Sequence, residues 1–376
     1  MRVAIIHYWL VGMRGGEKVL EAICRIFPDA DIYTHVADPA KLSDVLRRHR
    51  IIETSVGRLP YARRFYQAYL PLMPAALERL DLAGYDLVIS SEAGPAKGVI
   101  VPPEALHICY THSPMRYLWD QYHTYRRGAG LLSRMAMSVF APSLRIWDVT
   151  SAARVDHFLA NSTHVANRIR KYWRREAEVL HPPCDVVAFT PLPRGGHEAF
   201  YLWCGELAPY KRPDVAIAAF AALGLPLVVI GGPEKTRARL ARGAPANVTF
   251  LGKVSFEVLR DHLARCKALI FPGEEDFGIV PVEAMASGRP VIAYGRGGVC
   301  DTVIHGKTGW LYADPSVAGL VDAVREFEAS GLADCDPAVL AAHAARFDEA
   351  AFRDGLIRVL AAHGVVPEGH GAAADD

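Results

Sequence analysis

Two glutamates in the second half of the chain, Glu275 and Glu283, lie in a segment suited to binding a phosphorylated sugar. From position 271 it reads Phe-Pro-Gly-Glu-Glu-Asp-Phe-Gly-Ile-Val-Pro-Val-Glu-Ala-Met-Ala. The pattern predicts a buried strand that ends at Phe271, an acidic loop, and a helix that begins near Pro281, because proline is favoured at the first helical position. A helix N-terminus attracts phosphate through its unpaired N–H groups. The N–H groups expected to hold a diphosphate in this way belong to Phe277, Gly278 and Ile279.

The two carboxylates are separated by seven residues, with Glu275 in the expected loop and Glu283 inside the expected helix. A carboxylate can accept paired hydrogen bonds from vicinal hydroxyls, so Glu283 is expected to hold a ribose and Glu275 a sugar that is being transferred. The alternative is that both are solvated acids near a helix start, a placement that the helix dipole favours in any case. Spacing alone leaves both interpretations open.

The elements that must position these residues alternate between buried strands and helices along the whole chain. This alternation predicts an α/β fold with doubly wound parallel sheets. In the first half, the expected strands are Arg2–Trp9, Asp31–His35, Leu87–Ser91, His107–Thr111 and Phe158–Asn161, and the expected helices are Glu17–Phe27, Ala40–Arg47 and Thr163–Tyr172. In the second half, the strands are Ala199–Cys204, Leu227–Ile230, Val248–Phe250, Ala268–Phe271 and Pro290–Tyr294, and the helices are Asp214–Ala222, Glu234–Arg242, Phe256–Cys266, Val282–Ala286 and Ala318–Ala329.

Proline and glycine interrupt this rhythm at 181–185 and again at 191–196, which indicates a linker between two domains. We therefore expect an N-terminal Rossmann-like domain over 1–190 and a C-terminal one over 191–345. A helix over 346–363 is expected to pack back on the N-terminal domain, followed by a flexible tail over 364–376. Open parallel sheets bind ligands at the carboxyl ends of their strands, so two such domains facing across a cleft would place the site in that cleft.

Composition restricts the class of protein. No stretch approaches the roughly 18 apolar residues that a membrane span needs, and the apolar start of the chain predicts a first strand rather than a signal peptide. The seven cysteines are scattered, which argues against a zinc site or a disulfide framework and favours the cytoplasm. Residues 1–190 carry 24 Lys/Arg against 18 Asp/Glu, whereas residues 191–376 carry 18 against 23. The basic half suits an anionic membrane or ordinary surface variation, but not nucleic acid, because no dense basic run with stacking aromatics is present.

The acidic segment resembles the signature of glycosyltransferase family 4, whose members are retaining enzymes of GT-B fold. The resemblance extends almost from end to end, and it is more specific for the WbaZ-like mannosyltransferases of O-antigen and exopolysaccharide assembly. The segments that carry it are 275–288, Gly15-Gly-Glu-Lys near the N-terminus, Tyr85-Asp-Leu-Val-Ile-Ser-Ser, His107-Ile-Cys-Tyr-Thr-His-Ser-Pro-Met-Arg-Tyr-Leu-Trp-Asp and Pro209-Tyr-Lys-Arg-Pro-Asp. The resemblance implies a nucleotide-sugar donor, GDP-mannose above others, and a polyprenyl-diphosphate-linked saccharide as acceptor.

The same resemblance assigns roles to individual residues. Gly15 and Gly16 are expected to let the backbone approach the donor diphosphate and the acceptor, since a side chain would block close contact; a plain tight turn is the alternative. His112 matches a histidine that contacts the transferred hexose, although a histidine after a strand is more often structural. Lys211 matches the lysine that neutralises the donor phosphates. Catalysis is assigned to Glu275, His112 and Lys211, and donor binding to the other residues named.

One position departs from the family pattern. Family members usually carry arginine five positions before the lysine, but Glu206 stands there, and an anion cannot hold a pyrophosphate. Either Arg212 supplies the second cation or the site is built differently. The alternative for Arg212 is a surface residue at the start of helix Asp214–Ala222.

The segment from Arg58 to Pro74 mixes arginines with aromatic and aliphatic residues. Such a mixture suits the headgroup region of a membrane, and a surface helix packed on the N-terminal domain would show the same pattern. We therefore expect a cytoplasmic protein in peripheral contact with the inner face of an anionic membrane.

No carboxylate of the N-terminal half lies in a motif that marks a covalent nucleophile, which favours front-face attack by the acceptor. No Asp-x-Asp triplet is present, so turnover without a metal or other cofactor is expected, with cations and the helix start stabilising the leaving diphosphate. Two alternatives remain on sequence alone: a nucleotide-sugar epimerase or phosphorylase of the same fold, and a two-domain sugar-binding protein without catalysis.

Overall fold

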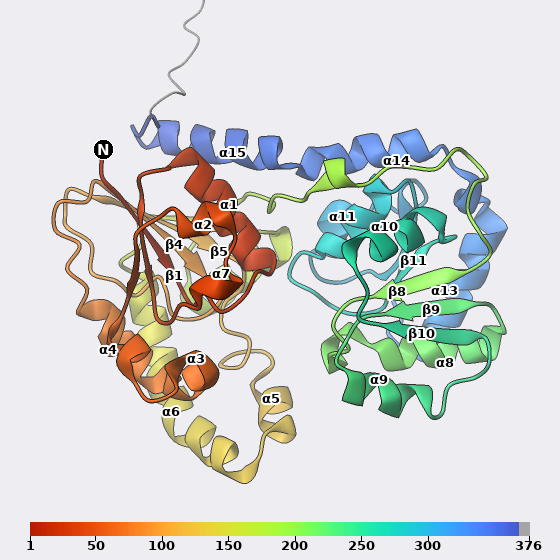
Figure 1. The fold of residues 1–376 in the computed structure, drawn as a ribbon, viewed down its shortest axis with the longest axis horizontal. Coiled ribbons are helices and arrows are strands. Elements are labelled where there is room, and N and C mark those ends of the chain that lie inside the picture. Colours follow the sequence, from red (N-terminus) through yellow and green to blue (C-terminus); the bar gives the residue numbers. More distant parts are fainter. Residues whose placement is uncertain (368–376) are drawn as a thin grey trace, which may run out of the picture. The chain divides into compact units, whose positions relative to one another are not determined.

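The computed structural model describes residues 1–367, so most of the expected tail, 368–376, lies outside the described residues. The chain divides into two compact units (Figure 1). Unit 1 contains Met1–His181 and the chain from Phe352 onward, and unit 2 contains Pro182–Ala351. The structure thus divides the chain after His181, at the first of the two proline-rich stretches, and not after residue 190.

Unit 1 is built on a seven-stranded sheet with strand order β3-β2-β1-β4-β5-β6-β7. Every pairing in it is parallel, as a sheet with helical crossovers requires. Successive side chains of a strand point to opposite faces of the sheet, and in the central strands the side chains on both faces are buried. The strands are β1 (Val3–His7), β2 (Asp31–Thr34), β3 (Ile51–Glu53), β4 (Leu87–Glu92), β5 (Leu106–Thr111), β6 (His157–Ala160) and β7 (Glu178–Val179).

Helices cover both faces of this sheet. One face packs on α1 (Gly15–Ile26), α2 (Asp44–Arg47) and α15 (Glu349–Ala362). The other packs on α4 (Met73–Glu78), α7 (Thr163–Trp173) and the second half of α6 (Leu131–Ala152). Between β3 and α4 the chain forms the short helices η2 (Ser55–Arg58), α3 (Ala62–Phe65) and η3 (Tyr66–Leu72), and α5 (Tyr122–Gly128) precedes α6.

The last helix belongs to unit 1 although it follows unit 2 in the sequence. Phe352, Leu356 and Leu360 of α15 are buried in the same core as Ile5 of β1. The Phe352 ring lies edge-on to the ring of Tyr110, with 5.6 Å between centroids. These contacts bury one apolar stripe of the helix against the sheet.

Two expected helices differ in the structure, and one helix of the structure was not expected. Helix α1 begins at Gly15 and not at Glu17, because the backbone of Arg14 and the Glu17 side chain form a cap there. The expected helix over 40–47 is split into a 3-10 turn, η1 (Pro39–Lys41), and α2, since the Ser43 hydroxyl caps a new start. The 22-residue helix α6 was not predicted, because Pro142 lies inside it and Gly130 offers no side-chain cap at its start.

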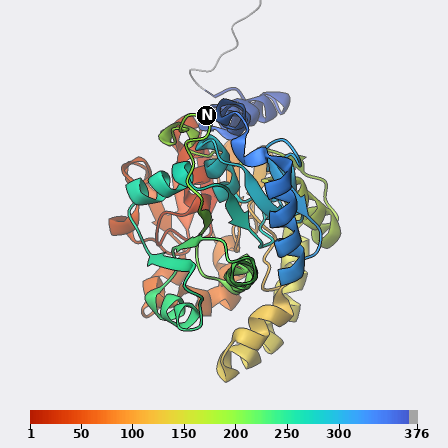
Figure 2. The same ribbon diagram turned by 90° about the vertical axis from the view of Figure 1, so that its right-hand side faces the viewer.

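Unit 2 repeats the doubly wound plan with a six-stranded sheet in the order β10-β9-β8-β11-β12-β13, again parallel throughout. Helices lie on both faces of this sheet (Figure 2). The strands are β8 (Tyr201–Cys204), β9 (Leu227–Ile230), β10 (Val248–Gly252), β11 (Leu269–Phe271), β12 (Val291–Tyr294) and β13 (Gly309–Tyr312). The helices are α8 (Pro213–Leu223), α9 (Glu234–Ala241), α10 (Phe256–Arg265), α11 (Ile279–Ala286), α12 (Val299–Thr302), α13 (Val317–Ser330) and α14 (Pro337–Ala344), with 3-10 turns η4 (Val186–Ala188), η5 (Pro209–Lys211), η6 (Leu332–Asp334) and η7 (Ala345–Phe347).

In both sheets the strand that comes first in the sequence of the unit pairs with the strand that comes fourth. The direction in which successive strands are added to the sheet reverses between these two strands. This switch point lies between β1 and β4 in unit 1 and between β8 and β11 in unit 2. Open parallel sheets bind ligands outside the carboxyl ends of their strands at such a switch point. Among residues 1–367 no helix is long and apolar enough to cross a bilayer.

Candidate functional site

An ion pair at the switch point of unit 2 joins the loops that follow β8 and β11. Lys211 closes η5, the turn after β8, and Glu275 lies in the loop between β11 and α11. The Lys211 Nζ atom lies 2.5 Å from Glu275 Oε1, and the two side chains are only 13% and 16% exposed. The structure therefore brings together two of the three residues predicted to act in catalysis.

Glycines allow the acidic loop to pack closely around this pair. A Cβ atom on Gly273 would lie 2.7 Å from Lys211 Cα, and one on Gly297 would lie 2.4 Å from the Glu275 carbonyl oxygen. The Gly298 N–H donates to that same carbonyl oxygen at 2.9 Å. The Gly297–Gly298 turn thus supports the loop from behind, so packing explains these glycines without any ligand.

Helix α11 starts earlier than expected. It begins at Ile279 and not near Pro281, since Gly278 adopts a left-handed conformation with φ of 87° and turns the chain into the helix. Pro281 fits in the first turn because N–H groups there have no intrahelical acceptor. The Phe277 side chain is buried in the core of unit 2, so only its backbone is available to a ligand.

Glu283 lies in the second turn of α11, where its carboxyl is half-buried. Burial and the nearby carboxylate of Asp185 raise its pKa to about 7, although the Lys211 ammonium partly offsets both. A carboxyl poised near neutrality can accept hydrogen bonds when ionised and donate one when protonated. The predicted helix position of Glu283 is confirmed, and the surroundings argue against a freely solvated acid.

Arg212 directly follows the catalytic candidate Lys211 and precedes α8. Its backbone is left-handed, with φ of 52°, and its guanidinium lies 3.6 Å from the carboxylate of Asp214. The Arg212 side chain is 38% exposed, and the Glu206 residue at the family arginine position is exposed as well. A phosphate role for Arg212 stays a prediction, because its position next to Asp214 also fits a residue at a helix start.

His112 in unit 1 lies at the end of a chain of hydrogen bonds that crosses three strand ends. It directly follows β5, and its Nε2 atom lies 2.8 Å from Ser91 Oγ at the end of β4. That hydroxyl also lies 3.0 Å from Nδ1 of His7, the last residue of β1. Burial, together with the neighbouring His112 ring, holds the pKa of His7 well below its usual range, so His7 is neutral. A neutral His7 and Ser91 can therefore fix the orientation and tautomer of His112.

Gly16 lies beside the same histidine. A Cβ atom on Gly16 would lie 2.3 Å from the Tyr8 hydroxyl oxygen and 3.6 Å from His112 Nε2. The lack of a side chain therefore allows the start of α1 to approach the ends of β1 and β5. Gly15 and Gly16 are the first two residues of α1, not part of a loop that precedes it.

Sequence reasoning missed several residues that hold the predicted ones in place. The Asn161 side-chain amide donates to the His112 carbonyl oxygen at 2.9 Å, and Ser91 and Tyr8 contact His112 or Gly16 as described. The sequence contained one weak indication of Asn161, Ser91 and Tyr8: each stands at the carboxyl end of an expected strand, where ligand sites form. Asp185 had no signal, because its proximity to Glu283 arises only when the linker folds against α11. Among the described residues, no three His, Cys, Asp or Glu side chains gather closely enough to hold a metal ion.

The raised pKa of Glu283 predicts a pH-dependent effect on stability. The folded protein binds this proton more tightly than the unfolded chain, so the contribution of Glu283 to stability is lost as pH rises from about 4.5 to about 7. Glu283→Gln should therefore raise the free energy of unfolding by about 1–3 kcal/mol at pH 8 and leave it nearly unchanged at pH 4. Urea titrations at the two pH values measure this.

Glu328→Gln is the matched control for that measurement. Burial alone would raise the pKa of Glu328, but hydrogen bonds from Lys267 and Tyr201 hold this pKa below its usual range. Replacing the Glu328 carboxylate should therefore not stabilise the protein at pH 8. If both variants behaved alike at pH 8, the assigned environment of Glu283 would be wrong.

Comparisons with known proteins indicate the family and the fold that the chain resembles. Residues 189–352 match the family model of glycosyl transferases group 1, which covers most of unit 2, including Lys211, Glu275 and Glu283. The D-inositol 3-phosphate glycosyltransferase of Mycolicibacterium smegmatis is 32% identical over 220 residues, which are 52% of this chain and 48% of the relative. The chain thus spans about half the length of this curated relative.

Two further similarities extend over more of the chain. The D-inositol 3-phosphate glycosyltransferase of Streptomyces coelicolor is 26% identical over 343 residues, 70% of this chain and 74% of the relative. The crystal structure of Anabaena HepE in complex with UDP superposes with a TM-score of 0.69 at 17% identity, covering 96% of this chain and all of that one. At that identity the likeness establishes the fold. Residues 189–352 therefore resemble the glycosyl transferases group 1, and the two units of the chain have the fold of GT-B glycosyltransferases.

Proposed function

We propose that this protein transfers a hexose from a nucleotide-sugar to an acceptor hydroxyl with retention of configuration at the anomeric carbon. The observation that carries the proposal is the Lys211–Glu275 pair at the switch point of unit 2, next to the start of α11. A cation and a helix N-terminus suit a diphosphate, and carboxylates suit sugar hydroxyls. The family match of this unit supports the assignment, as does the UDP held by the Anabaena neighbour.

Each predicted residue has a place in the proposed binding of donor. Lys211 and the backbone at residues 277–279 bind the diphosphate, and Arg212 adds a second cation. Glu283 holds the ribose and Glu275 the hexose, which means that the donor phosphates compete with Glu275 for Lys211. Gly15 and Gly16 leave room for the diphosphate and the acceptor. Two of the residues that carry catalysis, Lys211 and Glu275, lie together in unit 2, and His112 is the residue of unit 1 that would contact the hexose.

The proposed reaction proceeds by attack on the same face from which the diphosphate leaves. The acceptor oxygen forms a bond to the anomeric carbon as the bond from that carbon to the phosphate oxygen breaks. The acceptor proton passes to the departing phosphate oxygen, so the protein needs no base of its own. Lys211 and the start of α11 stabilise the charge that develops on the diphosphate, and Glu275 and His112 orient the sugar.

For donor and acceptor we propose GDP-mannose and a polyprenyl-diphosphate-linked saccharide, at the cytoplasmic face of an anionic membrane in surface polysaccharide synthesis. The curated relatives are named for an inositol phosphate acceptor, and the Anabaena neighbour holds UDP-glucose in one of its structures, so both differ from this proposal. Incubation with GDP-mannose, UDP-glucose and UDP-galactose over a bacterial lipid extract should transfer mannose to lipid most rapidly. Preferred transfer to inositol phosphate, or free-hexose release that requires phosphate, would contradict it.

Glu275→Gln should separate catalysis from nucleotide binding. The amide keeps the shape of the side chain but loses the charge that orients the hexose, so kcat should fall by about 100-fold. The affinity for the nucleoside diphosphate should not fall, because the uncharged amide competes less with the phosphates for Lys211. Glu328→Gln, which removes the acid of another Lys–Glu pair in unit 2, should leave both quantities unchanged. Full activity of Glu275→Gln would exclude the proposed role.

Turnover should not need a divalent metal. Lys211 and the helix start are proposed to supply the positive charge that a metal supplies elsewhere. Dialysis against EDTA should leave the rate within about twofold of the untreated enzyme. Loss of activity with EDTA and its recovery with manganese would show that this part of the account is wrong.

A further inference from the structure

The first half of α6 in unit 1 carries apolar side chains on its outer surface. Leu131, Leu132 and Val139 are 74%, 82% and 67% exposed, and Met135 and Phe140 are exposed as well. Both views show this half of the helix extending beyond the sheet of unit 1 (Figures 1 and 2). A monomeric protein in water gains nothing from such a surface, and contiguous exposed apolar patches mark interaction sites.

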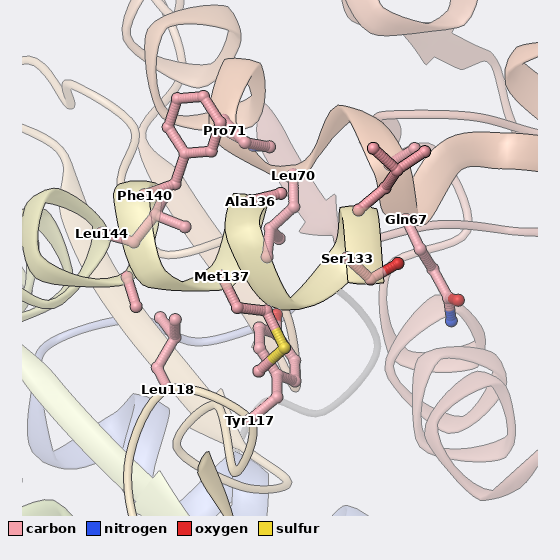
Figure 3. A pocket seen from close by; sticks show the side chains of 13 residues that line it. Gln67, Leu70, Pro71, Tyr117, Leu118, Ser133, Ala136, Met137, Phe140 and Leu144 are labelled. Atoms are coloured by element: carbon pink, nitrogen blue, oxygen red, sulfur yellow. The ribbon is translucent and has the colours of Figure 1, made fainter. Parts of the chain in front are cut away.

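A groove of about 330 Å³ lies between the same half of α6 and the 3-10 helix η3. No charged residue lines it, and most of the lining is aliphatic or aromatic. Figure 3 shows Ala136 and Met137 of α6 between Leu70 and Pro71 on one side and Leu118 on the other. Its volume is at the lower end of the range for ligand pockets, and its apolar walls suit a single hydrocarbon chain.

Arginines surround this groove in the sequence segments that form it. Residues 58–74 carry three arginines and residues 121–147 carry four, and neither segment contains a carboxylate. Most of these side chains are exposed: Arg58, Arg63, Arg64, Arg126, Arg127 and Arg134. An apolar groove between two segments whose charged side chains are all arginines is complementary to a molecule with a hydrocarbon chain and a phosphate.

The inner half of α6 is anchored firmly enough to hold the outer half in place. Lys97 is fully buried, and its ammonium pairs with Glu92 of β4 at 3.3 Å and with Asp148 of α6. The Nε1 atoms of Trp119 and Trp173 both donate to the other carboxylate oxygen of Asp148, at 2.7 Å. The apolar first half is therefore attached to a rigid base.

We propose that the groove between η3 and α6 takes up an acyl chain of an anionic phospholipid, and that unit 1 docks on a bilayer through the first half of α6. Hydrocarbon burial supplies the free energy, and the arginines bind phosphates at headgroup level. A second copy of the chain fits less well, because two such surfaces would bring cations against cations. The inference concerns lipid binding alone, so it holds whether or not the proposed glycosyl transfer is correct.

Sedimentation of the full chain with vesicles tests the docking. The protein should bind vesicles that contain phosphatidylglycerol, bind pure phosphatidylcholine at least tenfold more weakly, and lose affinity as salt rises. The double variant Leu132→Glu with Val139→Glu should bind phosphatidylglycerol at least tenfold more weakly, with an unchanged melting temperature because both side chains are exposed. Val187→Glu, at an 87% exposed position of unit 2, is the matched control and should bind like wild type.

Three results would overturn docking through α6. These are no binding of wild type to anionic vesicles, equal binding of the double variant, or a dimer in light scattering that the double variant abolishes. The last would show that a second copy covers the surface. Since no sugar donor is present in the assay, a failure of the proposed transferase activity cannot produce any of them.

Two neighbouring substitutions test the groove itself. Ala136→Trp should fill the groove and weaken binding to phosphatidylglycerol vesicles by at least fivefold. Met135→Trp, one residue away and outside the groove, should bind as tightly as wild type or more tightly, since tryptophan favours the membrane interface. Equal affinity of the two variants would show that no acyl chain enters the groove.

Discussion

The candidate site depends on one ion pair that joins two loops of unit 2 at its switch point. Lys211 and Glu275 come from the loops after β8 and β11, adjacent strands of a parallel sheet whose winding reverses between them. The pair is mostly buried, so its charges are screened less than those of a surface pair. A buried pair adds little net stability, but it can fix the geometry of two loops. It also holds the lysine in a position where it can bind a phosphate of the donor.

The two units use different interactions to fix the candidate side chains at the ends of their strands. Unit 2 uses an ion pair at its switch point, whereas unit 1 uses the hydrogen-bonded chain of His7, Ser91 and His112 at the ends of three strands. Unit 1 has a fully buried charged cluster of Lys97, Asp148 and Glu92. Burial alone would lower the pKa of Lys97, but the two carboxylates together raise it. That buried cluster connects β4 to α6, so the strand that supplies Ser91 also anchors the helix proposed to dock on lipid.

Much of the fold could be predicted from the sequence because strands and helices alternate with clear periodicity. The acidic segment indicated a loop and a helix with Glu275 before it and Glu283 inside it, and the structure confirms both positions. The start of α11 was misplaced because proline was taken as the first helical residue, whereas Gly278 turns the chain three residues before it.

Other features could not be predicted for physical reasons. Helix α6 contains Pro142 and has no side-chain cap at Gly130, so the usual sequence signals did not indicate one long helix. Ser91 and Tyr8 act through contacts between strands that only the sheet order creates. The environment of Glu283 depends on Asp185, which lies almost a hundred residues earlier and is brought near by the linker. The sequence indicates the type of chemistry, but the long-range packing determines which groups support it.

The measurement that tests the central claim most directly is the titration of unlabelled GDP and UDP into wild type and Lys211→Ala by calorimetry. Lys267→Ala is the matched control, because it breaks another Lys–Glu pair of unit 2 that lies outside the candidate site. The account predicts that Lys211→Ala loses at least tenfold in affinity for the nucleoside diphosphate, while Lys267→Ala binds like wild type. Equal affinity of wild type and Lys211→Ala for both nucleotides would contradict the claim that this ion pair marks the donor site.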